Sequence, residues 1–155
     1  MDLLTPSDPE AARRAVSLFV QGFTCAQAVL AAFADRFGLD EVAALKLGTP
    51  FGGGMARTGG MCGAVTGALM VIGMAHGRTT IEDVQAKETT YLATKAFWDR
   101  FGALHGSTTC RELLQVDIGT EEGAKRAGDA GLFRERCPLF VRDAARLLDE
   151  TLGRS

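Results

Sequence analysis

The sequence predicts an all-α protein, a single-domain compact helical bundle of about five to seven helices spanning residues 1–155. Only 4 prolines occur in the 155 residues, and no segment shows the strict apolar–polar alternation of a half-buried strand. Helix-start patterns recur along the chain, and a mostly apolar, Gly/Ala-rich run near its middle predicts a buried central helix. With 46% apolar and 23% charged residues, the composition is that of an ordinary globular domain.

The N-terminal third predicts three helices. Ser7 and Glu10 have the spacing of a capping box, and so do Thr24 and Gln27. Asp40 provides a third N-cap, and Gly38 is placed to end the helix before it. Helices are therefore expected at residues 7–22, with Pro9 in the first turn, and at residues 24–37 and 40–48.

A glycine-rich loop at residues 49–60 separates these helices from the central one. The apolar run at residues 61–75 has about fifteen residues, fewer than the roughly 20 that cross a bilayer. Gly63 and Gly67 are four residues apart, so they lie on one face of the predicted helix and let a neighbouring backbone come close. The same small-residue face could instead form a homodimer contact.

The second half of the chain predicts one long helix and several shorter ones. A start at Thr80 opens a helix reaching Leu104, in which Leu92, Lys95, Trp98 and Phe101 recur at helical spacing and the aromatic rings are expected in the core. Another start lies at Thr109. Residues 116–131 are polar and predict one or two helical turns, and an apolar stripe predicts a final helix at residues 139–152.

Charge and the N-terminal sequence narrow the functional class. The chain has 17 basic and 19 acidic side chains and a net charge of -2, so no basic field would recruit nucleic acid or an anionic membrane. The first residues contain no secretory signal pattern, and we expect a cytoplasmic protein. In a reducing compartment, four cysteines favour redox chemistry or metal binding over structural disulfides.

All four cysteines fall at predicted helix starts. Cys25 and Cys110 each follow a threonine N-cap, Cys137 is expected as an N-cap before Pro138, and Cys62 is expected just inside the central helix. The positive end of a helix favours an anion, so the pKa of each thiol is expected to be lowered. The alternative is that each cysteine is a small buried apolar residue.

The spacing of the cysteines is not that of a known metal or redox motif. The intervals contain 36, 47 and 26 residues, and no Cys-x-x-Cys pair occurs. Any shared site must therefore be assembled by the tertiary fold, with helix dipoles offsetting the negative charge of the thiolates.

These motifs together resemble the C_GCAxxG_C_C family of small redox-active proteins with four signature cysteines. The resemblance rests on residues 24–29 (TCAQAV), 51–55 (FGGGM) and 62–67 (CGAVTG), and on the isolated Cys110 and Cys137. It implies that the four cysteines are the functional set. A similar module accompanies haem domains in some redox proteins, which favours an iron–sulfur centre slightly over zinc, although no haem-attachment motif is present here.

The glycine loop matches no nucleotide-binding motif. The P-loop Lys-Ser/Thr is missing after Gly59, and Arg57 replaces the third glycine of the dinucleotide fingerprint. We expect Gly53, Gly54 and Gly63 to be cofactor-binding residues that let the backbone approach a cluster or ligand, with Arg57 adding positive charge. The alternative is a loop that needs glycine only for positive φ.

Two histidines lie at predicted helix ends. His76 and His105 are expected to interact with the negative end of a helix, and either could instead join the thiolates as a metal ligand.

The leading hypothesis is a redox-active protein, an oxidoreductase or electron-transfer component with an unidentified redox partner. Its predicted catalytic and metal-binding residues are Cys25, Cys62, Cys110 and Cys137. They would bind an iron–sulfur cluster or zinc, or no cofactor while cycling between dithiol and disulfide with Cys62 as the most accessible attacking thiol. The alternative function is a structural metal-binding or partner-docking domain.

Overall fold

The computed structural model describes residues 3–153, which fold as α-helices and two short 3-10 helices without a strand. Eight α-helices have five or more residues, and a ninth, α8, has four. The helices are α1 (Glu10–Val20), α2 (Cys25–Ala34), α3 (Glu41–Gly48), α4 (Gly63–His76), α5 (Val84–His105), α6 (Cys110–Leu114), α7 (Glu121–Asp129), α8 (Leu132–Glu135) and α9 (Cys137–Leu152). The all-α prediction is confirmed. The number of helices exceeds five to seven because the region after Val116, where one or two helical turns are expected, forms two separate helices, α7 and α8.

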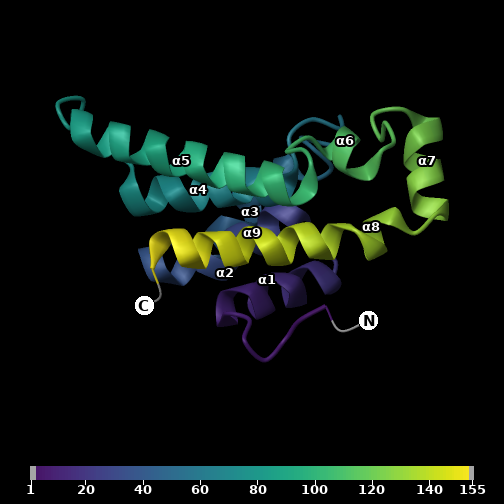
Figure 1. The fold of residues 1–155 in the computed structure, drawn as a ribbon, viewed down its shortest axis with the longest axis horizontal. Coiled ribbons are helices and arrows are strands. Elements are labelled where there is room, and N and C mark those ends of the chain that lie inside the picture. Colours follow the sequence, from purple (N-terminus) through teal and green to yellow (C-terminus); the bar gives the residue numbers. More distant parts are fainter. Residues whose placement is uncertain (1–2, 154–155) are drawn as a thin grey trace.

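The core lies where α2 and α4 pack together between the other long helices. Helix α2 packs against α1, α3 and α4, and α4 also packs against α5 and α9. Figure 1 shows α5 lying along α4, α9 crossing the bundle with α1 beside it, and α6–α8 extending from one end. The chain leaves the bundle after α5 and returns to it in α9.

The central helix α4 is as buried and as closely packed as predicted. A Cβ atom on Gly67 would lie 2.9 Å from the backbone oxygen of Ala26 in α2, closer than real Cβ contacts. Within residues 3–153, every helix is either too short or too polar to cross a bilayer. The face of α4 that carries Gly63 and Gly67 packs against α2 inside the bundle.

The first helix start differs from the prediction. Helix α1 begins at Glu10 with Pro9 at the N-cap position and no side-chain cap, so the capping box at Ser7 is wrong. Asp8 instead accepts a 2.6 Å hydrogen bond from the backbone N–H of Thr5, which forms a turn before the helix. The second start is confirmed, because Thr24 and Gln27 form both hydrogen bonds of a capping box.

The long helix α5 begins later than predicted and turns a different face to the core. Its N-cap is Asp83, which accepts a hydrogen bond from the backbone N–H of Ala86, rather than Thr80. Phe97 and Phe101 are fully buried, whereas Leu92 is 68% and Trp98 is 37% exposed. The prediction for Trp98 is wrong because the next residue in a helix is rotated by about 100° from its neighbour. Phe97 therefore takes the core position.

A buried group of charged side chains ties the N-terminal segment to α5 and α9. Arg146 forms ion pairs with both Asp8 and Asp143, and His105 Nε2 lies 3.0 Å from Asp143 Oδ2. Burial raises the pKa of Asp143, but hydrogen bonds from His105 and Arg142 outweigh it and lower that pKa to about 2. His105 ends α5 as predicted, and its partner is a carboxylate.

Candidate functional site

The four cysteines lie at the beginnings of four helices. Cys25, Cys110 and Cys137 are the first residues of α2, α6 and α9, and Cys62 is the residue before α4. Two details differ from the prediction: Cys62 occupies the N-cap position rather than the first turn, and Cys137 lies inside α9 after Arg136. The prediction that every cysteine accompanies a helix start is confirmed.

A short antiparallel bridge brings Cys62 and Cys110 together. Met61 pairs with Thr109, the N–H of Cys62 donates a 2.8 Å hydrogen bond to the oxygen of Thr108, and the N–H of Cys110 donates a 2.7 Å hydrogen bond to the oxygen of Gly60. Alternate residues of paired segments point to the same side, so both thiols lie on the side opposite Met61 and Thr109. The bridge explains how residues 48 positions apart share one side of the site.

Cys25 and Cys137 form a second pair through their side chains. A hydrogen bond from the Cys25 thiol to the sulfur of Cys137 raises the pKa of Cys25 and lowers that of Cys137, and helices α2 and α9, which carry these residues, pack against each other. Arg136, just before α9, donates hydrogen bonds to the backbone oxygens of Leu113 and Leu114 at the end of α6. The helix carrying Cys137 is thereby held against the helix carrying Cys110.

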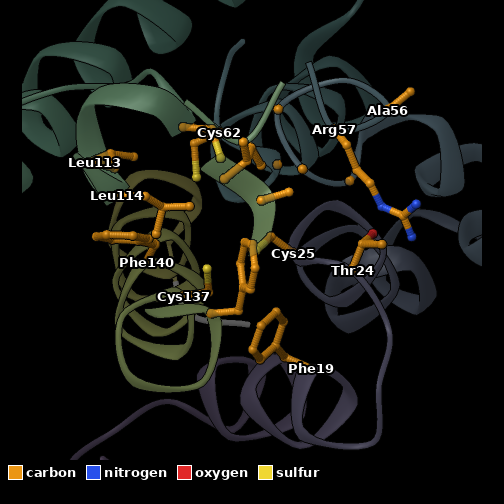
Figure 2. Close-up of a pocket in the computed structure, with 18 of the residues that line it drawn as sticks. Phe19, Thr24, Cys25, Ala56, Arg57, Cys62, Leu113, Leu114, Cys137 and Phe140 are labelled. Carbon is orange, nitrogen blue, oxygen red and sulfur yellow. The ribbon is translucent and has the colours of Figure 1, made fainter. Parts of the chain in front are cut away.

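All four cysteines line one cavity with a volume of about 700 Å³. Of the fifteen other lining residues, eight are aromatic or aliphatic: Phe19, Ala56, Leu113, Leu114, Ile118, Ala124, Phe133 and Phe140. Figure 2 shows Leu113, Leu114 and Phe140 on one side of the sulfur atoms and Arg57 and Thr24 on the other. The fold therefore gathers the four thiols around a shared, mainly apolar space.

The pKa values depart from the sequence prediction at three of the four cysteines. Burial raises the pKa of Cys62 to about 12 and that of Cys110 to about 11. The hydrogen bond to Cys137 and burial raise the pKa of Cys25. Only the pKa of Cys137 is lowered, because its sulfur accepts the hydrogen bond from Cys25. Removal from water outweighs the helix N-terminus at Cys62 and Cys110.

Cys62 is therefore not the most accessible attacking thiol. It is 4% exposed, and the backbone N–H groups of Ala64 and Val65 lower its pKa less than burial raises it. Cys25 is the one partly exposed cysteine of the set, and Cys137 is the one with a lowered pKa. The prediction that Cys62 is the most accessible thiol is wrong because a residue beside a glycine loop need not be exposed to solvent.

The thiols are not arranged as a metal site. Among residues 3–153, no group of three or more His, Cys, Asp or Glu side chains is placed to hold a metal ion. The donor chemistry suits zinc or an iron–sulfur cluster, but the side chains would have to move to ligate either. His76 ends α4, and neither histidine lines the cavity.

The three glycines expected to bind a cofactor lie in the cavity wall and allow close packing there. A Cβ atom on Gly54 would lie 2.8 Å from Cys110 Cβ, and one on Gly63 would lie 3.1 Å from Cys25 Cβ. The glycine loop and the start of α4 can therefore pack directly against two cysteines. A role of Gly53, Gly54 or Gly63 in binding a cofactor stays a prediction.

The glycine loop contains a left-handed turn. Residues 53–57 all have positive φ, and three of them, Met55, Ala56 and Arg57, are not glycine. Each non-glycine residue in this region costs roughly 1 kcal/mol or more, so the fold must hold the turn in place. Hydrogen bonds from the N–H groups of Ala56 to Pro50 and of Gly60 to Gly54 do so. The turn brings Arg57 into the cavity wall.

The aromatic side chains of the cavity wall could not be assigned to the site from the sequence. Phe19 and Phe140 carry the helical periodicity that indicates a core, and nothing local distinguishes a core position from a position beside a cavity. Phe133 lies in α8, a helix too short to show periodicity.

A comparison with protein-family models matches residues 23–151 to the model described as "Putative redox-active protein (C_GCAxxG_C_C)". The match covers all four cysteines and the glycine loop. Comparisons with curated proteins and with solved structures returned no match.

Proposed function

Because this chain belongs to the C_GCAxxG_C_C family of redox-active proteins, we propose that it exchanges electrons by thiol–disulfide chemistry with Cys25 and Cys137 as the working pair. The proposal rests on the cavity that both thiols line and on the hydrogen bond between them. That hydrogen bond lowers the pKa of Cys137, as a dithiol that oxidises to a disulfide requires.

The exchange needs no reactant other than a substrate disulfide. The Cys137 thiolate attacks one sulfur of that disulfide, which forms a mixed disulfide and releases the other half as a thiolate that takes up a proton. Cys25 then loses its proton, attacks the Cys137 sulfur and releases the second half as a thiol. Two electrons have passed from the protein dithiol to the substrate, and Cys25 and Cys137 are joined.

Cys62 and Cys110 would stay protonated during this exchange at neutral pH. Their pKa values of about 12 and about 11 leave very little thiolate, and thiols attack poorly. Their place in the cavity wall makes them candidates for a second exchange with the new disulfide.

Oxidation of the reduced protein with a small disulfide is expected to join Cys25 to Cys137 first. Thiol counting in denaturant should fall from four to two, and mass spectrometry of the digested protein should recover the peptides of α2 and α9 linked. Cys110→Ser, which removes a cavity thiol outside the pair, is the matched control and should form the same link. A first disulfide between Cys62 and Cys110, or four thiols that stay free, would contradict the proposal.

A second candidate function, metal ligation, is favoured by one observation: four thiols line one cavity, and iron–sulfur clusters are held by four cysteines. The absorption spectrum and metal content of oxygen-protected protein separate the two candidates. Thiol–disulfide chemistry predicts a colourless protein without stoichiometric metal. Visible charge-transfer bands would indicate a cluster, and one zinc per chain without colour would indicate a structural site.

A further inference from the structure

Among the residues the structure describes, Arg57 is the one charged residue that lines the cavity; its side chain is exposed, and in Figure 2 its guanidinium points away from the sulfur atoms, so it lies at the edge of the cavity. No carboxylate lines the cavity, and within residues 3–153 the Arg57 guanidinium has no ion-pair partner. Beside Arg57 lie Thr24 and the first turn of α2, which has the positive end of a helix dipole. This side of the cavity is therefore suited to an anionic group.

The opposite side of the cavity suits an apolar group. Leu113, Leu114 and Phe140 lie across the sulfur atoms from Arg57 (Figure 2). Phe19 and Phe133 add two further aromatic rings to the cavity wall. A volume of about 700 Å³ is typical of a pocket that encloses a small organic molecule.

Burial of the thiols decides between a small and a macromolecular substrate. Cys62, Cys110 and Cys137 are 4%, 9% and 8% exposed, so a disulfide fixed on the surface of another folded protein could not reach Cys137. A small molecule that enters the cavity could.

From these observations we propose that the cavity takes a small disulfide with an apolar, aromatic or aliphatic body and an anionic group, the anion lying at Arg57. The inference rests on the proposed function and specifies its substrate class. The reaction remains the exchange described above: the substrate disulfide is reduced to two thiols, and Cys25 and Cys137 are oxidised to one disulfide. Arg57 is a binding residue that takes no part in the electron transfer.

The proposal can be tested by comparing two aromatic disulfides that differ in charge. Dithiobisnitrobenzoate carries a carboxylate on each ring, and dithiodipyridine is neutral at neutral pH. The rate of thione or thiolate release from each would be measured with the wild type, Arg57→Gln, Arg57→Lys and Lys95→Gln. Lys95, which is exposed on α5 and does not line the cavity, controls for the loss of one positive charge.

Arg57→Gln is expected to lower the rate of reaction with the anionic reagent about fivefold at low ionic strength. This is the effect of about one contact between unit charges in water. The neutral reagent should be unaffected, Arg57→Lys should keep most of the rate, and Lys95→Gln should change neither. Added salt should reduce the difference between Arg57→Gln and the wild type.

Two results would overturn the substrate assignment. Equal slowing of both reagents would show that Arg57 supports the wall without recognising charge, and no slowing of either would show that it does not touch the ligand. The proposed function is tested separately by Cys137→Ser with the neutral reagent. If that variant reacts like the wild type, the working pair is wrong whatever the effect of Arg57.

Discussion

Replacing Cys137 by serine is expected to slow the reaction of the native protein with a neutral disulfide by about 10-fold or more at neutral pH. The variant must react through thiols whose pKa values are raised, and burial raises the pKa of Cys110 to about 11 and that of Cys62 to about 12. Even the Cys110 thiol is ionised on the order of 100-fold less than an ordinary cysteine, and its greater intrinsic nucleophilicity recovers only about 10-fold. Stopped-flow absorbance of reagent release measures the rate.

The control for this substitution is Cys110→Ser, which also removes one sulfur from the cavity. Because the Cys110 thiol has a pKa of about 11, its loss should change the rate less than twofold. If Cys110→Ser reacts as slowly as Cys137→Ser, Cys110 takes part in the reaction and the proposed pair of Cys25 and Cys137 is wrong.

The pH profile tests the cause of the low pKa of Cys137. The thiolate of Cys137 is stabilised by a hydrogen bond from Cys25, so the rate should rise with pH around a midpoint below that of an ordinary thiol. Cys25→Ala removes the donor and should move the midpoint to higher pH, whereas Cys25→Ser keeps a hydroxyl donor and should move it less. Identical midpoints in the two variants would mean that the hydrogen bond does not set the pKa.

Replacing Gly63 by alanine is expected to destabilise the protein by about 1–3 kcal/mol, the usual cost of overpacking a well-packed core. The added Cβ would lie 2.9 Å from the Ala26 nitrogen and 3.1 Å from Cys25 Cβ, and both belong to the first turn of α2. Helices α2 and α4 must then separate where they hold two of the cysteines. Chemical denaturation of the reduced protein measures the free energy of unfolding.

Gly73 in the same helix supplies the matched control. A Cβ atom there meets nothing within 4 Å, so Gly73→Ala should stabilise the protein by up to about 1 kcal/mol through helix propensity. If Gly63→Ala is as stable as the wild type, the glycine is not needed for packing, and its role is limited to binding a ligand. If both variants lose stability equally, the difference in their surroundings is not what decides the effect.

Helix starts and ends were largely predictable because their signals are local. The capping box of Thr24 and Gln27, the N-cap Asp40 and the left-handed Gly38 each act within a few residues. The predicted helix starts at Ser7 and Thr80 are wrong because each helix begins a few residues later, with Pro9 and Asp83 as the N-cap residues. The exposed Trp98 shows that a helical stripe can be recognised while its rotation toward the core is not.

The sequence by itself determined the helices and the placement of each cysteine at a helix beginning, because capping and periodicity depend on neighbouring residues. Only the tertiary structure decided which thiols meet, since a bridge between Met61 and Thr109 and the packing of α2 on α9 join segments far apart in the chain. It also decided the acidity of those thiols. The helix dipole is a local property, whereas removal from water depends on everything packed around the sulfur. Removal from water is the larger effect at Cys62 and Cys110, and at Cys25 the hydrogen bond to Cys137 acts in the same direction.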